Sequence, residues 1–217
     1  MQVEIWSDVI CPWCYIGKRR FETALALFAH RDQVRVVWRS FELDPDAPQH
    51  YPGTLNERLA TKYGVSLQQA AAMNTRVTDI AKEVGLAYRL EQARPGNTFD
   101  AHRLLHFAAA QARSQEAGER IMHAYFCEGL AVGDRTALAR LAPQFDIAED
   151  AALAILEGDD YGAAVRNDEA RAAQLGITGV PFFVFAEKYA VSGAQPVSVF
   201  VEALEQTWNE ADTHQSD

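Results

Sequence analysis

Two cysteines separated by two residues are the part of this sequence most able to perform chemistry. They form the segment Cys11-Pro12-Trp13-Cys14, and the third cysteine, Cys127, lies far along the chain. A thiolate is the nucleophile of disulfide exchange, and a second thiol one helical turn away can attack the mixed disulfide that results. This spacing between a strand candidate and a helix candidate is typical of a redox motif.

The order of the two thiols predicts their roles. Pro12 is favoured in the first turn of a helix, so the helix is expected to begin there. The helix N-terminus favours an anion, which predicts that Cys11 attacks the substrate and Cys14 resolves the mixed disulfide. Half of a zinc site and a pair of inert thiols are the alternatives. Structural zinc needs four ligands, and the sequence has no second Cys-x-x-Cys pair.

A second metal hypothesis comes from four residues with helical spacing. His102 and His106 share one predicted helix face, and His123 and Cys127 share another. Together they could form a three-histidine, one-cysteine zinc site. The first pair lacks the glutamate of the helical metalloprotease motif, so we expect ordinary helix histidines and no metal. Cys127 is expected to be a buried apolar residue.

The elements that must position the cysteines form two groups. Strands are expected at 3–6, 34–43, 180–185 and 189–192, with helices from Pro12 and from about 196. The intervening chain predicts helices at 55–63, 66–84, 98–114, 116–130, 135–142, 148–157 and 159–175. Residues 1–45 and 177–210 should therefore form one α/β unit. Residues 46–176 should be an all-helical insertion whose last helix, about 159–176, returns to that unit, and the polar tail 209–217 should fray.

Composition excludes several function classes. The chain has 217 residues and a formal net charge of −10, which argues against a nucleic-acid or anionic-membrane binder. It has no run of about 18 apolar residues and no recognisable signal peptide, so a cytoplasmic protein without a membrane helix is expected.

Four segments resemble one family. The segments Ser7-Asp-Val-Ile-Cys-Pro-Trp-Cys-Tyr-Ile-Gly-Lys-Arg-Arg-Phe21, Gly176-Ile-Thr-Gly-Val-Pro-Phe-Phe-Val184 and Val191-Ser-Gly-Ala-Gln-Pro196 are similar to the FrnE-type branch of the DsbA-like thioredoxin-fold oxidoreductases, as is Asn97-Thr-Phe-Asp-Ala-His-Arg-Leu104. The resemblance implies a thioredoxin fold with a large all-helical insertion. It also implies a cis bond between Val180 and Pro181, facing the cysteines and guiding the substrate.

The residues between the cysteines are expected to tune the redox pair. The DsbA pattern carries a histidine there, whereas Pro12 and Trp13 offer no cation. A disulfide that is a weaker oxidant than that of DsbA is therefore expected.

Other residues are weaker candidates. Lys18, Arg19 and Arg20 could raise the potential near the thiolate, although a solvated helix face is the expected role. Asp8 and Asn97 could border the cleft. Ala194 and Gln195 precede the last helix, whose N-terminus could hold a carboxylate such as that of glutathione.

These observations predict a thiol–disulfide oxidoreductase, which could also act as a disulfide isomerase. Its substrates would be proteins or small molecules with thiols or disulfides, and its reductant would be glutathione or a thioredoxin system. No cofactor is expected beyond glutathione as a co-substrate.

The alternative is a glutathione-dependent isomerase or transferase of the 2-hydroxychromene-2-carboxylate isomerase or kappa class, whose members are expected to carry serine at the position of Cys11. A binding module or holdase with an idle motif is a third reading. The sequence leaves the substrate, the direction of electron flow and the choice between monomer and homodimer open.

Overall fold

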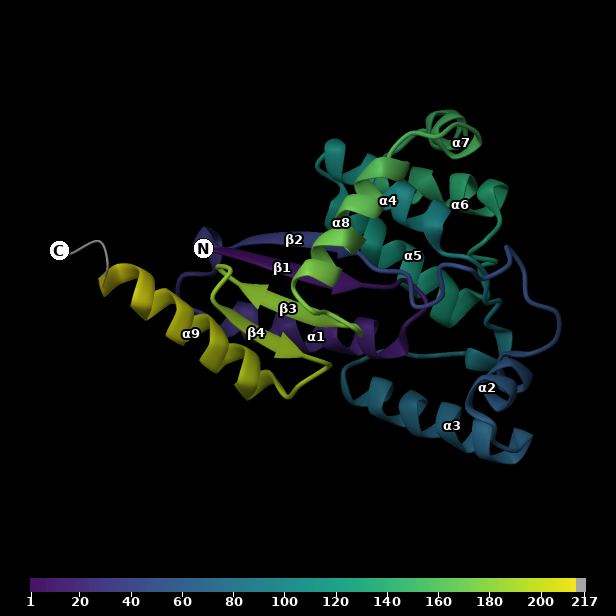
Figure 1. Ribbon diagram of the computed structural model, residues 1–217, viewed down its shortest axis with the longest axis horizontal. Coiled ribbons are helices and arrows are strands. Elements are labelled where there is room, and N and C mark those ends of the chain that lie inside the picture. The colour runs from purple at the N-terminus through teal and green to yellow at the C-terminus, as the bar shows by residue number, and fades with distance from the viewer. Residues whose placement is uncertain (214–217) are drawn as a thin grey trace.

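A four-stranded sheet forms one half of the molecule in the computed structural model, which describes residues 1–213 (Figure 1). Its strands are β1 (Gln2–Ser7), β2 (Arg35–Ser40), β3 (Phe182–Phe185) and β4 (Tyr189–Ser192), in the order β2-β1-β3-β4. β1 and β2 are parallel, and the other neighbours are antiparallel. Helix α1 (Pro12–Leu27) makes the crossover that a parallel pair requires.

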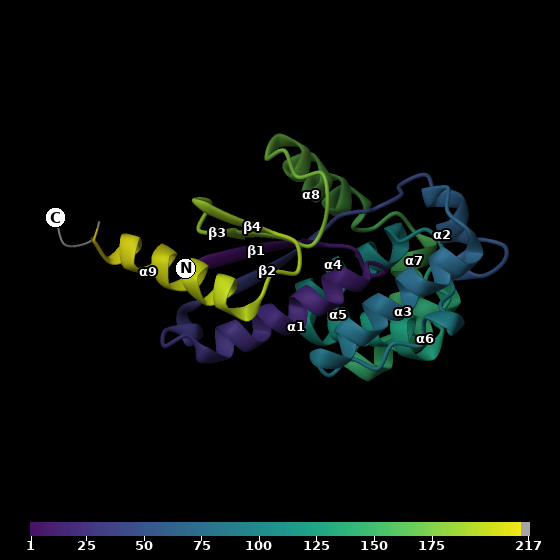
Figure 2. The same cartoon turned by 90° about the horizontal axis from the view of Figure 1, so that it is seen from below.

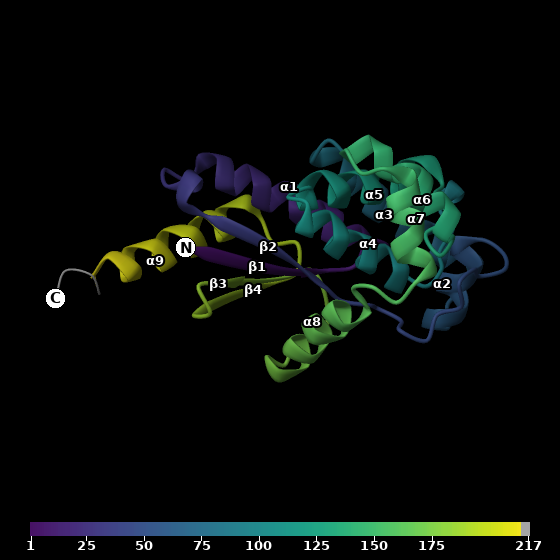
Figure 3. The ribbon, with the colours of Figure 1, turned by 90° about the horizontal axis from the view of Figure 1, so that it is seen from above.

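Helices cover both faces of the sheet. α1 and α9 (Val197–Thr213) lie on one face and α8 (Gly162–Gln174) on the other (Figures 2 and 3). Alternation along β1 explains this division, because successive side chains of a strand point to opposite faces. Val3 and Ile5 belong to the apolar cluster shared with α1 and α9, whereas Trp6 packs against the α8 side.

The remaining helices form a separate block beside the sheet (Figure 1). Two of them begin with capping boxes, at Thr54 and Ser66, which satisfy backbone N–H groups that a helix start leaves unpaired. The block contains α2 (Leu55–Tyr63), α3 (Leu67–Glu83), α4 (Phe99–Ala110), α5 (Ser114–Glu128), α6 (Arg135–Leu141) and α7 (Glu149–Glu157). Short 3-10 turns lie at Arg31–Gln33 (η1), Leu90–Gln92 (η2) and Ala142–Phe145 (η3).

The predicted elements are all present, with several different boundaries. β2 stops at Ser40, because beyond it the amide of Leu43 donates to a side-chain oxygen of Asp8 instead of a neighbouring strand. β3 begins at Phe182, since Pro181 has no N–H to donate to a ladder. The predicted helix 98–114 ends at Ala110.

The last helix extends further than the sequence predicts. The sequence predicts fraying from residue 209, whereas α9 continues to Thr213. Residues 214–217 of the predicted tail lie outside the described part of the chain. Among the described helices, none has the length and apolar character needed to cross a bilayer.

Candidate active site

Cys11 caps the N-terminus of α1. Its backbone is extended, with φ −84° and ψ 114°, and its carbonyl accepts bonds from the amides of Cys14 (3.0 Å) and Tyr15 (3.4 Å). Pro12 occupies the first turn, as its spacing predicts. Cys11 and Cys14 are both free thiols in this structure. The motif thus brings one thiol to the helix start, where the helix dipole favours a thiolate, and the other one turn inside.

The Val180–Pro181 segment faces the first thiol. The Cys11 Sγ lies 3.7 Å from the carbonyl oxygen of Val180, to which it donates. The bond between Val180 and Pro181 is cis, as the resemblance implies. Cys11 is 5% exposed and Cys14 is 1% exposed, so the first thiol is the more accessible of two buried groups.

Cys14 is enclosed by apolar and polar groups of the strand end. Burial, the largest influence, and the neighbouring Cys11 raise the pKa of Cys14 well above its ordinary value. The side chain of Ser7 and the backbone of Asp8 act in the opposite direction, because each favours the thiolate and so lowers the pKa of Cys14. Cys14 therefore holds its proton at neutral pH until a group nearby accepts it.

Tyr88 is a contact of the motif that the sequence reasoning missed. Its hydroxyl donates to the carbonyl of Pro12 at 2.8 Å, and its ring stacks on Phe126 at a centroid distance of 4.6 Å. Burial, and secondarily the nearby Cys11 thiolate, raise the pKa of Tyr88. Tyr88 lies in an irregular stretch between α3 and η2, where no periodic pattern marked it. The helical block thus holds the backbone between the two cysteines.

Gly17 is a second residue that the sequence reasoning missed. A Cβ atom at this position would lie 2.9 Å from Cγ of Pro181. The absence of a side chain on α1 therefore lets the proline ring sit directly against the helix. This close approach is a physical reason for glycine in the middle of a helix, where it otherwise costs about 1 kcal/mol.

An apolar groove of about 290 Å³ opens at Cys11 between α1, the helical block and Val180. Trp13 is 42% exposed there, and the exposed side chains of Leu43, Tyr63 and Met73 line the same groove. The further lining residues are Ile10, Cys11, Pro12, Leu55, Arg58, Leu59, Lys62, Asn74, Val77, Leu90, Tyr125, Phe126 and Val180. Large apolar side chains are thus gathered where a substrate sulfur would reach the thiol, which is typical of an interaction site.

The weaker candidates lie elsewhere. Asp8 is fully buried behind the motif, and Asn97 uses its side chain to bond the carbonyls of Pro45 and Ala47 and the amide of Phe99. Gln195 is exposed and donates to its own loop, and Ala194 packs against the core near Gly17. None of the four lines the groove at Cys11.

The basic residues after the motif correct the prediction of a solvated face. Lys18 is 4% exposed and bonds Glu22 (2.5 Å) and Glu119 (2.6 Å). Arg19 pairs with the same two carboxylates, and Arg20 donates to a backbone carbonyl. The prediction failed because the partner Glu119 comes from α5, about a hundred residues away in the sequence.

The histidines have separate partners. His102 lies 3.5 Å from Asp8, His106 lies 3.1 Å from Asp168, and His123 lies 3.0 Å from Glu128. Within residues 1–213, no three His, Cys, Asp or Glu side chains gather as a metal site would require. Cys127 is buried in the core of the helical block, and burial raises its pKa.

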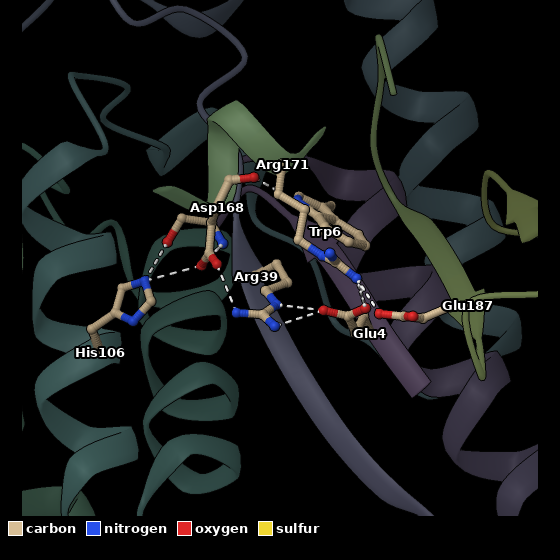
Figure 4. Close-up of polar contacts among 8 residues, drawn as sticks. Glu4, Trp6, Arg39, His106, Asp168, Arg171 and Glu187 are labelled. Atoms are coloured by element: carbon tan, nitrogen blue, oxygen red, sulfur yellow. Dashed lines mark hydrogen bonds and ion pairs between the residues drawn. The ribbon is translucent and has the colours of Figure 1, made fainter. Parts of the chain in front are cut away.

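A charged network fixes α8 to the sheet beneath the site (Figure 4). Asp168 accepts from the amide of Ser40 (3.0 Å), from Arg39 (2.9 Å) and from His106, and its carbonyl accepts from Trp6 (3.0 Å). Burial opposes ionisation of Asp168, but these donors outweigh it and lower its pKa. The helix that leads back into β3, and hence Pro181, is thereby anchored.

Comparison with known proteins defines the class that this fold and site represent. The family model for the DSBA-like thioredoxin domain matches residues 2–205, so the chain belongs to that family of oxidoreductases. A crystal structure described as a probable DsbA oxidoreductase from Streptomyces coelicolor is 46% identical. Its TM-score is 0.93, and the match covers 97% of this chain and 91% of that one.

Two more distant structures share the fold. One is a 2-hydroxychromene-2-carboxylate isomerase, with 14% identity, a TM-score of 0.73 and 98% of each chain covered. The other is the cytosolic disulfide reductase DsbM from Pseudomonas aeruginosa with GSH, with 15% identity and a TM-score of 0.65, covering 96% of this chain and 100% of that one. At these identities the likeness concerns the fold alone.

Proposed function

We propose that this protein is a thiol–disulfide oxidoreductase of the FrnE-type branch, with Cys11 as the nucleophile and Cys14 as the resolving thiol. The observation that carries the proposal is the position of Cys11. It caps a helix, opens onto an apolar groove and faces the Val180 carbonyl, while Cys14 lies behind it. Pro12 and Trp13 tune the pair, and Val180 and Pro181 guide the substrate.

The exchange balances with thiols alone. The Cys11 thiolate attacks one sulfur of a substrate disulfide, an S–S bond breaks, and one substrate thiolate leaves. The Cys14 thiolate then attacks Cys11 Sγ, which releases the second substrate thiolate and forms the Cys11–Cys14 disulfide. The substrate gains two electrons, and the protein loses two. Oxidation of a substrate dithiol is the reverse sequence, so the proposal includes no metal or organic cofactor.

The groove supports substrates with apolar surroundings. An extended segment bearing a thiol or disulfide would lie beside Val180, whose backbone can pair with it in the manner of strand addition. Proteins and small molecules both fit this description. Glutathione or a thioredoxin system would regenerate the reduced pair, and a cytosolic setting is supported by the fold shared with a cytosolic disulfide reductase.

A glutathione-dependent isomerase is the second candidate, favoured by the fold shared with 2-hydroxychromene-2-carboxylate isomerase. The residues favour the first candidate, because an isomerase of that kind is expected to use one hydroxyl and needs no resolving thiol. Here two thiols stand at the helix start.

Insulin reduction tests the proposal. Wild type supplied with glutathione should accelerate insulin precipitation, and both Cys11→Ser and Cys14→Ser should lose the acceleration. Cys127→Ser is the matched control and should retain it, since Cys127 lies outside the groove. Turnover of an aromatic isomerase substrate with glutathione, without any insulin reduction, would favour the second candidate instead.

A further inference from the structure

Cys14 lies almost entirely inside the protein. In the proposed function Cys14 must lose a proton before it attacks Cys11, yet it is 1% exposed and enclosed by core residues. Bulk water therefore has no direct access to its proton. The group that accepts the Cys14 proton therefore has to lie inside the protein, or be linked to Cys14 through buried hydroxyl groups or water.

Asp8 and His102 form a buried pair close to Cys14. The backbone of Asp8 contacts the Cys14 sulfur, and the Asp8 side chain is completely buried. One carboxylate oxygen accepts from the Leu43 amide at 2.9 Å. The other, Oδ1, has no hydrogen-bond partner and lies 3.5 Å from Nε2 of His102, which also has none.

A small cavity of about 40 Å³ lies beside His102. Ser7 and His102 border it, together with Trp38 from β2. The Ser7 hydroxyl, the Trp38 indole N–H and the His102 Nε2 are all buried without hydrogen-bond partners. A cavity of this size has room for water, and unpaired buried polar atoms are the usual partners of such water.

Ser7 connects the cavity with the reacting sulfur. Its side chain is close enough to Cys14 to lower the pKa of that thiol, and Ser7 lines the cavity that His102 also lines. The path from Cys14 to His102 thus passes through the Ser7 hydroxyl and through the cavity, which is large enough for water.

We propose that Asp8 and His102 form the proton-accepting pair for Cys14, reached through Ser7 and water in this cavity. In the resolving step the Cys14 thiol gives its proton along this path to His102, and Asp8 stabilises the imidazolium that forms. The Cys14 thiolate then attacks Cys11 Sγ. In the reverse reaction Cys14 leaves as a thiolate and recovers the same proton. Ser7 lies next to the reacting sulfur, His102 accepts its proton through water, and Asp8 acts through His102 as a positioning residue.

The other charged and titratable groups around the cavity are already paired. Lys18 from α1 bonds two glutamates, Arg39 from β2 bonds Glu4 and Asp168, and His106 from α4 bonds Asp168. Tyr125 of α5 faces Asp8, and burial raises its pKa, so it stays neutral. Among the described residues that line the cavity, His102 is therefore the titratable group left to accept a proton.

Dithiobis(nitrobenzoate) separates the two thiol steps in one trace. Attack by Cys11 releases the first coloured thiolate, and attack by Cys14 on the mixed disulfide releases the second. In His102→Gln the first phase should keep its wild-type rate, which shows that the site is folded. The second phase should slow by about 10-fold or more near neutral pH, the loss typical of a missing general base.

The pH profile separates a proton-transfer role from a structural one. The deficit of His102→Gln should shrink as pH rises toward about 10, because hydroxide then replaces the missing acceptor. Asp8→Asn should show the same pattern. His123→Gln is the matched control: it makes the same substitution outside the cavity, at a side chain paired with Glu128, and should leave both phases unchanged.

The outcomes are distinguishable. A second phase that ignores His102→Gln at every pH, or a deficit that stays constant with pH, would overturn the relay and leave the proposed function intact. Absence of the first phase in wild type would overturn the proposed function itself, and the relay with it.

Discussion

At the residue scale, the position of one sulfur decides what the site can do. Cys11 combines a helix start, a facing carbonyl and an apolar groove, whereas Cys14 is withdrawn into the core. Nucleophilic attack needs access, and resolution needs only a short approach to Cys11. The asymmetry between two chemically identical side chains therefore comes entirely from their surroundings.

Gly17→Ala should weaken disulfide exchange by displacing Pro181. The new Cβ would approach Cγ of Pro181 to 2.9 Å, so the ring must shift away from α1 and Val180–Pro181 changes its position relative to the cysteines. Insulin reduction should fall several-fold. Thr23→Ala is the control, because it changes an exposed side chain on the same helix and should keep full activity. Equal activity of both variants would show that the close packing of Pro181 on α1 is dispensable.

At the element scale, α8 is the connection that carries the chain from the helical block back to the sheet. Asp168 joins it to β2 and α4, and Trp6 joins it to β1. Glu4, on the same face of β1 as Trp6, bonds Arg171 of α8 and Arg39 of β2 (Figure 4). The loop to Pro181 follows directly, so the geometry of the site depends on this network.

Asp168→Ala should destabilise the protein by about 3–5 kcal/mol at neutral pH, since it leaves buried donors unpaired. The folded pKa of Asp168 is lowered, so its stabilisation is complete above about pH 4 and is lost as pH falls through the folded pKa. Denaturant unfolding at several pH values checks this. Asp32→Ala, at a side chain 95% exposed, is the control and should change little. A loss of unfolding free energy in Asp168→Ala that persists unchanged in acid would contradict the claim that ionised Asp168 stabilises the fold.

The loop after β2 carries a buried carboxyl with the opposite behaviour. Burial raises the pKa of Glu42 to about 7, helped by Glu169 and opposed by Arg166. Because the folded pKa of Glu42 lies above its unfolded value, the protonated side chain contributes its full stability below about pH 4, and this contribution is lost as pH rises through 7. Glu42→Gln should therefore raise the melting temperature near pH 8 by about 2–4 °C for each kcal/mol relieved.

The same variant should melt like wild type near pH 5, where Glu42 is already neutral. The exposed Glu83→Gln serves as control and should shift neither melting temperature. A lower melting temperature of Glu42→Gln at pH 8 would show that the ion pair with Arg166 outweighs the cost of burial.

At the scale of the whole molecule, the reduction potential decides the direction of electron flow. Pro12 and Trp13 bring no cation to Cys11, so we expect a potential more negative than the about −120 mV of DsbA. Trp13 beside the pair offers a fluorescence signal for equilibration with glutathione buffers. A potential at or above that of DsbA would show that other groups stabilise the reduced form.

The sequence predicts the architecture well because periodicity and the motif agree. The strands, the order of helices and the placement of Cys11 opposite Val180 follow from local patterns and from the resemblance. The burial of Lys18 and the roles of Tyr88 and Gly17 did not, because each depends on a partner distant in sequence. Asp8 and Asn97 are expected from the sequence to border the cleft, whereas Asp8 is fully buried and Asn97 bonds the carbonyls of Pro45 and Ala47.

Trapping of the mixed disulfide tests the central claim most directly. Cys14→Ser, incubated with a disulfide substrate and digested without reductant, should carry a substrate adduct on Cys11 detectable by peptide mass. Cys11→Ser should carry no adduct on Cys14. An adduct on Cys14 or Cys127, or none on Cys11, would contradict the assignment of Cys11 as the nucleophile.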